Sequence, residues 1–276
     1  MVKPSTRQLS IEEVRKVQLG VLGEFDRLCR SHGLTYYLAY GTLLGAVRHG
    51  GYIPWDDDVD VMMPRGDYDR LHDVFASAAP PHLSLSSPRT RLDWPFGFAK
   101  IGDERTELEE SLADPLPLAV NIDVFPLDAL PSNGLVRGLQ SAVLQLLRWA
   151  VELRYVDPVR GRGWHHPVAI AVVKPLLSLL PLRLLVAAFS WAARSGGARG
   201  DRVGVRVGFY DWSVSADKLG APVELCFEHL LLLAPAESGA VLTAVYGNYG
   251  QRPPEAAQIS EHLFTATWST AGPRPT

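Results

Sequence analysis

The stretch YIPWDDDVDVMMP, residues 52–64, places four aspartates within five positions and then continues into valines and methionines. The apolar residues predict a buried strand, and carboxylates at the mouth of such a strand repel one another and lose hydration. A solvated acidic turn is the alternative interpretation. The pattern Asp-Val-Asp-Val argues against it, because it embeds the acids in apolar sequence rather than in a loop. We therefore expect a cation to compensate the charge.

The order of the aspartates predicts which of them act together. Side chains alternate across a strand, so Asp58 and Asp60 are expected to share one face of a strand at residues 57–63. Asp56 would extend that row, and Asp57 would face away. Two carboxylates side by side form a hard-oxygen site suited to Mg²⁺, with Mn²⁺ as an alternative.

A third acid and a glycine-threonine turn lie on either side of this strand in the sequence. Asp123 stands in the strand-like segment NIDVF, and it either joins the metal site or faces water at a sheet edge. Gly41 and Thr42 precede a short helical turn, whose free backbone N–H groups are suited to holding a phosphate. Arg48 and His49 are candidates to contact the same anion, although either is equally an ordinary surface residue.

The first half of the chain alternates between strand-like and helical patterns, which indicates an α/β (α+β) domain. The expected strands are residues 35–40, 57–63, 96–101 and 121–125, and the expected helices are residues 10–33 and 67–78. The first helix is predicted to begin with a capping box formed by Ser10 and Glu13.

Composition excludes several classes of protein. The net charge of -3 and the pI near 6.2 argue against a protein that coats nucleic acid. Two cysteines far apart in the sequence indicate neither a disulfide framework nor a zinc cluster, and favour a reducing compartment. Residues 1–13 contain no apolar segment typical of a secretory signal, so we expect a cytoplasmic protein.

The middle of the chain has a different character from its flanks. Residues 135–202 hold ten Lys/Arg and three acids, a balance of +7, within apolar helical patterns at residues 135–153 and 167–193. Charges and prolines interrupt the second pattern, and its longest uncharged run, residues 184–193, is too short to span a bilayer. Two interpretations remain open: a buried helical subdomain, or an amphipathic element that lies on the inner face of an anionic membrane.

Residues 41–71, with the sequence GTLLGAVRHGGYIPWDDDVDVMMPRGDYDRL, closely resemble the signature of the LicD family. FAKIGDERT at residues 98–106, NIDVFPLDALP at residues 121–131 and the closing FE…LLAP…LTAVYGNYGQRPP within residues 227–254 resemble that family as well. The resemblance implies a nucleotidyltransferase-like mixed sheet flanked by helices. It divides the chain into a catalytic core at 1–131, a mainly helical insertion at 132–222 and a segment at 223–276 that completes the core.

The resemblance also implies an activity and roles for individual residues. Members of the family resemble Mg²⁺-dependent phosphotransferases that move a phospho-alcohol, such as phosphocholine, from a CDP-activated donor to a hydroxyl of a sugar or glycan. Asp58, Asp60 and Asp123 would be catalytic residues and metal ligands. Lys100 would lie near the donor phosphates, although it is equally an ordinary lysine at a strand end.

Three other functions are compatible with parts of the pattern. A nucleotidyltransferase that transfers NMP to a small molecule would use the same three acids. A metal-dependent glycosyltransferase would use an Asp-x-Asp pair alone, so the upstream Gly-Thr turn and the downstream third acid count against it. A catalytically silent membrane scaffold has no reason to keep buried carboxylates.

Overall fold

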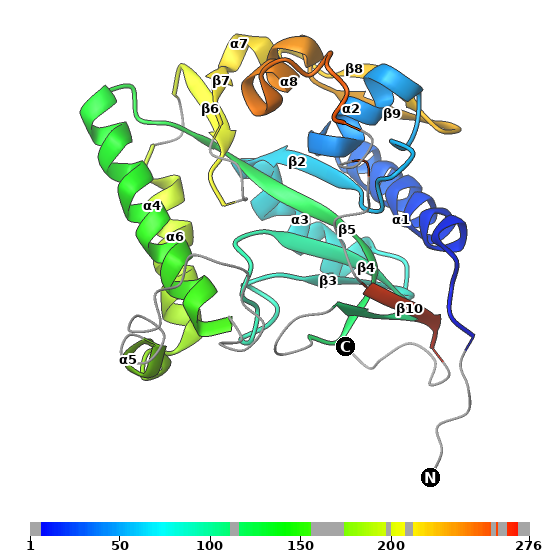
Figure 1. Cartoon of the computed structure of the whole chain (residues 1–276), viewed down its shortest axis with the longest axis horizontal. Helices are drawn as coiled ribbons and strands as arrows, with labels where there is room; N and C mark the ends of the chain where they lie inside the picture. The colour runs from blue at the N-terminus through cyan, green and yellow to red at the C-terminus, as the bar shows by residue number, and fades with distance from the viewer. Residues whose placement is uncertain are drawn as a thin grey trace.

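The fold is a curled mixed β-sheet flanked by helices, which confirms the predicted α/β class (Figure 1). The computed structural model describes residues 7–110, 116–155, 174–196, 200–207, 212–254, 258 and 264–269. The main path of the sheet has the strand order β1-β2-β5-β4-β10, formed by Tyr37–Leu38, Asp60–Pro64, Leu118–Ala129, Ala99–Glu110 and Phe264–Trp268.

The pairing of β2 with β5 positions the candidate site. These two strands run parallel, whereas the other paired strands in the described part of the chain run antiparallel. Three short strands extend the sheet: β3 (Leu83–Ser86) pairs with β4, β6 (Arg202–Val205) pairs with the end of β5, and β7 (Val214–Ser215) pairs with β6.

Helices α1 (Ile11–Ser31) and α3 (Arg65–Ala78) pack against each other and against β5. The predicted capping box of α1 is confirmed, because the Ser10 hydroxyl accepts the Glu13 N–H and the Glu13 carboxylate accepts the Ser10 N–H. This cap fixes the first turn of the helix, and buried side chains at helical spacing anchor the rest: Val14, Gln18, Val21, Leu22, Phe25, Leu28 and Cys29.

A second group of elements lies at the top of Figure 1. Helix α2 (Tyr40–His49) packs on β2, on α8 (Ser238–Tyr246) and on β8 (Val223–Phe227), which forms a hairpin with β9 (Leu230–Ala234). A short helix, α7 (Ala216–Leu219), packs against α8. The last described strand, β10, returns to the main sheet and pairs with β4.

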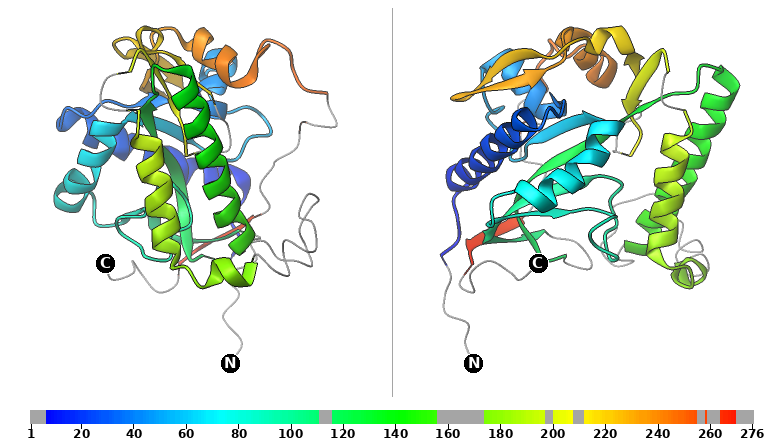
Figure 2. Two further views of the ribbon diagram at one scale, coloured as in Figure 1. Left: turned by 90° about the vertical axis from the view of Figure 1, so that its left-hand side faces the viewer. Right: turned by 180° about the vertical axis from the view of Figure 1, so that it is seen from behind.

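Helices α4 (Gly134–Tyr155) and α6 (Leu182–Arg194) stand side by side as an outer layer, with the short α5 (Lys174–Ser178) beneath them (Figure 2). The two predicted helical segments are therefore found, apart from residues 156–173, which lie outside the described part of the chain. The range 132–222 also contains β6 and β7, which belong to the sheet. The predicted domain boundaries stay a prediction.

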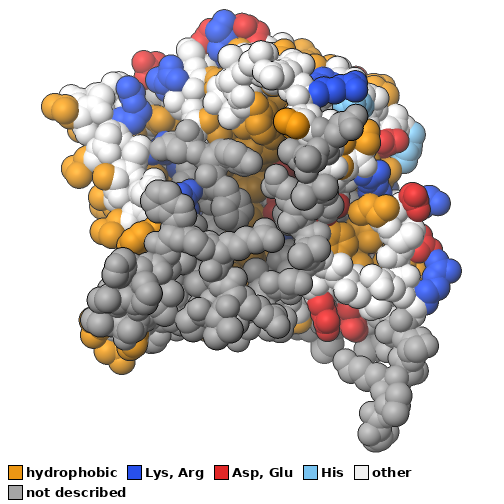
Figure 3. Space-filling model, viewed as in Figure 1, with side chains coloured by type: hydrophobic (Ala, Val, Ile, Leu, Met, Phe, Trp, Pro, Cys, Tyr) orange, Lys and Arg blue, Asp and Glu red, His pale blue; other side chains and the backbone are white. Residues whose placement is uncertain are grey.

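The outward side of α4 carries a row of exposed apolar side chains, including Leu135, Leu139 and Leu146 at 87%, 67% and 67% exposure. Figure 1 places α4 at the left of the molecule, and hydrophobic side chains are visible along that edge in the space-filling view (Figure 3). In the described part of the chain, none of the helices combines the length and the apolar character needed to cross a membrane.

The predicted strand bounds differ from the observed ones at the aspartates. The strand expected at residues 57–63 is β2 at Asp60–Pro64, so Asp56, Asp57 and Asp58 lie in the loop before it. The reason is that strand pairing begins only at Asp60, and the carbonyl groups of Asp56 and Asp57 bind side chains of α1 instead of a neighbouring strand.

Candidate active site

Asp60 and Asp123 lie side by side at the centre of the candidate site. They are register partners on the parallel strands β2 and β5. The backbone N–H of Asp123 donates to the carbonyl oxygen of Val59 over 2.8 Å, which ties the two strands together at this level. The two acids therefore face each other because of strand pairing, although 63 positions separate them in the chain.

Asp60 is the carboxylate that is most costly to ionise. It is only 8% exposed, and burial raises its pKa well above the usual value for an aspartate. The negative charges of Asp58, Asp123 and Asp56 raise that pKa further, whereas the ammonium group of Lys100 lowers it. A bound cation would reverse this balance by favouring the ionised form.

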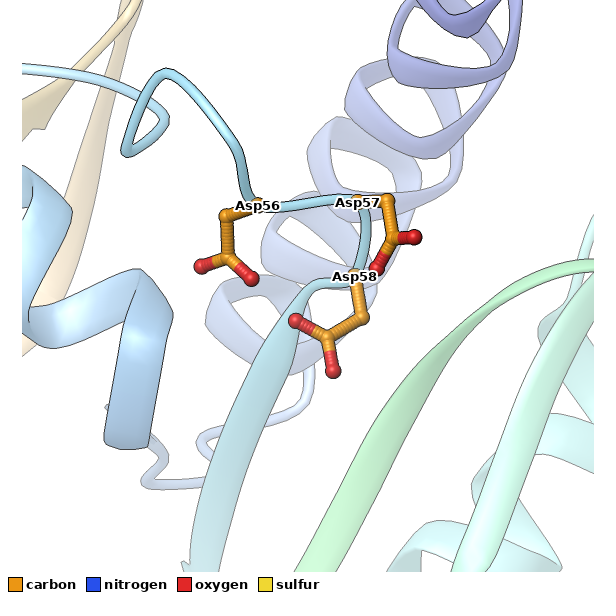
Figure 4. A group of neighbouring side chains, drawn as sticks. All are labelled: Asp56, Asp57 and Asp58. Atoms are coloured by element: carbon orange, nitrogen blue, oxygen red, sulfur yellow. The ribbon is translucent and has the colours of Figure 1, made fainter. Parts of the chain in front are cut away.

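The three consecutive aspartates before β2 form a group of their own (Figure 4). One carboxylate oxygen from each of Asp56, Asp57 and Asp58 lies within 4.8 Å of the others. The prediction that Asp57 faces away from its neighbours is therefore wrong. Side chains alternate only within a strand, and this segment is a loop that turns Asp57 back toward the group.

Gly41 and Thr42, in the first turn of α2, contact the aspartates directly. The Thr42 hydroxyl accepts the backbone N–H of Asp60 over 2.8 Å. A Cβ atom on residue 41 would collide with the Asp56 carboxylate, so glycine allows the close approach of α2 to the loop. This turn holds the acids in place, and its predicted contact with a phosphate stays a prediction.

Arg48 and His49 lie in the last turn of the same helix. A rise of about 1.5 Å per residue puts Arg48 roughly 9 Å along the axis from Thr42. The Arg48 guanidinium donates to the carbonyl oxygen of Tyr249 over 3.2 Å. Their predicted contact with the anion held at Gly41 and Thr42 is not tested by these positions and stays a prediction.

Lys100 pairs with Asp123 across the β4–β5 ladder. Its ammonium nitrogen lies 2.7 Å and 2.9 Å from the two Asp123 carboxylate oxygens, and it sits over the ring of Phe98 at 5.7 Å. Its predicted position near the donor phosphates stays a prediction. In the structure, this one lysine faces a site that holds the carboxylates of Asp56, Asp58, Asp60 and Asp123.

The residues present fit a divalent cation. Carboxylates are the hard oxygen ligands that Mg²⁺ and Mn²⁺ prefer, and Mg²⁺ sites commonly combine one or two of them with substrate phosphates. Burial raises the pKa of Asp60, and the charges of Asp58, Asp123 and Asp56 raise it further. A cation bound among Asp58, Asp60 and Asp123 would offset these charges, and the Asp56–Asp58 group offers further oxygens beside it.

Three further side chains support the site. The sequence gave no functional signal for two of them, and the third, Glu228, stands in the segment FE…LLAP that resembles the LicD family. Arg15 and Gln18 appear in the sequence only as polar positions of the first helix, yet they bind the backbone of the aspartate loop. Glu228 accepts the N–H of Tyr52 over 3.0 Å, and its own N–H donates to the carbonyl of Gly50 over 2.7 Å.

Comparison with known proteins relates part of this region to one family. Residues 33–94 match the model of the family described as LicD/FKTN/FKRP, nucleotidyltransferase domain. The lipopolysaccharide cholinephosphotransferase LicD of Haemophilus influenzae is 36% identical over 128 residues, 46% of this chain and 48% of the relative. Residues 33–94 are thus similar to the nucleotidyltransferase domain of the LicD family, and the chain spans about half the length of this relative.

Two further relatives carry no described function. An uncharacterized protein of Rickettsia prowazekii is 33% identical to this chain over 75 residues, 24% of the chain and 28% of the relative. One from Rickettsia typhi is 53% identical over 41 residues, 15% of the chain and 13% of the relative. The matches thus span about half or less of each curated relative.

Proposed function

We propose that this chain is a Mg²⁺-dependent phosphotransferase that moves a phospho-alcohol from a CDP-activated donor to a hydroxyl group of a sugar or glycan. Phosphocholine is the first candidate, because the relative from Haemophilus influenzae is a lipopolysaccharide cholinephosphotransferase. The observation that carries the proposal is the buried, charge-crowded Asp60 beside Asp123, in the segment that follows the family's Gly-Thr turn.

Asp58, Asp60 and Asp123 are the residues proposed to hold the cation. When bound, Mg²⁺ would neutralise charge on the donor diphosphate and on the departing nucleotide. The backbone at Gly41 and Thr42 is proposed to orient a donor phosphate at the first turn of α2. Thr42 also keeps β2 at this turn through its hydrogen bond to Asp60.

Asp123 and Lys100 are proposed to act on the acceptor side and on the donor side, respectively. Two hydrogen bonds from the lysine hold the Asp123 carboxylate in one orientation. In that orientation Asp123 would accept the proton of the attacking hydroxyl, as a general base must lie within hydrogen-bond reach of the proton that it removes. Lys100, next to Asp123, would contact the phosphates of the donor. Arg48 and His49 are kept as candidates for contacts with the same donor.

A panel of CDP-alcohols tests the reaction. Purified protein is incubated with Mg²⁺ and each donor, with and without a glycan acceptor, and CMP is measured by chromatography. We expect CMP release with at least one donor and none from the Asp60→Asn variant. Consumption of nucleoside triphosphates with release of pyrophosphate would support an NMP-transferring enzyme instead, and cleavage of sugar nucleotides would support a glycosyltransferase.

The outer face of α4 is the proposed contact with an anionic membrane, on the cytoplasmic side, where a lipid-linked acceptor would be found. Its exposed leucines and the basic composition of residues 135–202 support this proposal. Sedimentation with liposomes at low salt tests it. Recovery of the protein in the supernatant with and without anionic lipid would instead support a helical layer that serves only the fold.

A further inference from the structure

The aspartate loop, residues 51–59, has no helix or strand of its own, so its backbone carbonyl groups depend on other partners. Arg15 of α1 provides several of them with one guanidinium group. Its Nη2 donates to the carbonyl oxygens of Ile53 and Pro54 at 3.2 Å and 3.0 Å. Its Nε donates to the carbonyl oxygen of Asp56 at 3.2 Å, and Nη2 binds that oxygen as well.

Gln18 binds the next carbonyl group along the loop. Its side-chain nitrogen donates to the carbonyl oxygen of Asp57 over 2.9 Å. The Tyr52 hydroxyl donates to the other end of the same amide over 3.1 Å, which sets the orientation of the amide. Gln18 and Tyr52 are 4% and 8% exposed, and the guanidinium of Arg15 lies 4.8 Å from the centre of the Tyr52 ring. These contacts form one network, which is buried at Gln18 and Tyr52 and half-buried at Arg15.

Helix α1 and Glu228 both hold this network in place. Arg15 and Gln18 are three residues apart, so they project from one face of α1. That helix is capped by Ser10 and anchored in the core. Glu228, which directly follows β8, accepts the N–H of Tyr52 and holds the beginning of the loop.

We propose that Arg15 and Gln18 are positioning residues of the aspartate site. By fixing the carbonyl groups of Asp56 and Asp57, they set the directions in which the neighbouring carboxylates point. Without them, repulsion between like charges would push the loop open and separate the ligands. The inference rests on the proposed metal site, and loss of such supporting contacts typically weakens metal affinity by about 10- to 100-fold.

Two variants and a control test the proposal. Gln18→Met removes the donor at nearly constant volume. Arg15→Lys keeps the charge but loses the planar fork that binds several carbonyl groups at once. Lys16→Met, at an exposed position beside Arg15, removes a positive charge from the same helix turn without reaching the network.

The first measurement is amide hydrogen exchange of the peptide covering residues 51–60 in metal-free protein. We expect faster exchange in both variants than in the wild type and the control, with the rest of α1 unchanged. The second measurement is calorimetric titration with Mn²⁺. We expect affinity that is about 10- to 100-fold weaker in both variants.

Each outcome decides a different point. Unchanged exchange in the loop would overturn the proposal, as would faster exchange with unchanged Mn²⁺ affinity. Wild-type affinity in Arg15→Lys alone would show that only the charge of Arg15 matters, against a geometric role. If the wild type itself binds neither Mn²⁺ nor Mg²⁺, the metal site fails as a proposal, while exchange in the loop still decides whether Arg15 and Gln18 hold it.

Discussion

Strand β5 carries two aspartates, five positions apart, whose surroundings differ sharply. Asp128 forms a bidentate ion pair with Arg65, whose Nε and Nη2 donate to the two carboxylate oxygens over 2.7 Å and 2.6 Å. The Asp128 side chain is 2% exposed. Asp123 also has a cationic partner, Lys100, at 2.7 Å, but it stands beside the buried Asp60 and within reach of the charges of further aspartates.

The difference lies in the balance of charge. At Asp128 one guanidinium meets one carboxylate in a bidentate pair, which satisfies both groups and leaves nothing for a ligand. At Asp123 one ammonium group meets several carboxylates, and burial together with the neighbouring negative charges raises the pKa of Asp60. The first arrangement is typical of a structural ion pair, and the second of a site that is completed by a cation. Three predictions test this contrast and a fourth concerns a site away from it, in order from the largest expected effect to the smallest.

Replacing Asp60 by Asn should lower turnover by about 10² to 10³-fold, because the variant loses charge that would hold the cation. The metal-free protein should be as stable as the wild type or slightly more stable, since a source of carboxylate repulsion is removed. Steady-state kinetics and thermal unfolding without metal check both parts. Full activity in Asp60→Asn or in Asp123→Asn would remove that residue from the proposed site.

Replacing Asp128 by Asn should have the opposite signature. Removing one partner of a buried ion pair leaves the other charge without compensation, which typically costs about 3–5 kcal/mol of unfolding free energy. Turnover per folded molecule should stay near the wild-type value. Urea unfolding measures the loss, and the double variant Arg65→Met/Asp128→Leu should recover much of it. Loss of metal binding in Asp128→Asn would show that the two regions are not independent.

Thr42→Val should fall between these two cases. The change leaves the buried N–H of Asp60 without its partner, which typically costs about 1–3 kcal/mol of unfolding free energy. Because this N–H lies at the start of β2, turnover should fall as well. Thr42→Ser keeps the hydroxyl and serves as the control. Equal stability and activity of the Val and Ser variants would show that the hydrogen bond contributes to neither region.

The smallest effect concerns pH and lies away from both aspartates. Burial lowers the pKa of His72, so the unfolded chain takes up this proton at higher pH than the folded protein. The contribution of His72 to stability is therefore complete above its ordinary pKa of about 6.5 and is lost as the pH falls. Urea midpoints at about pH 7.5 and about pH 5.5 should differ more in the wild type than in His72→Gln. If the urea midpoint changes equally with pH in the wild type and in His72→Gln, the pH dependence does not come from His72.

Local pattern was sufficient for much of the fold. The capping box at Ser10 and Glu13, the apolar spacing of the first helix and the helical period of residues 135–153 each depend on residues within one or two turns. The acids at Asp58, Asp60 and Asp123 could be selected in the same way, because carboxylates embedded in strand-forming sequence are costly unless a ligand compensates them. Their catalytic roles stay predictions.

Tertiary structure alone decided how these acids are arranged. The direction of Asp57, the pairing of Lys100 with Asp123 and the hold of Arg15 on the loop all join segments that local patterns treat separately. The distance along the chain is the physical reason. The hydrogen bond from Gln18 to the backbone carbonyl of Asp57 depends on how α1 packs against the sheet. No short-range pattern of residues encodes that packing. Sequence by itself determined which residues carry the charge, and the packing of α1, α2 and β5 determined where that charge points.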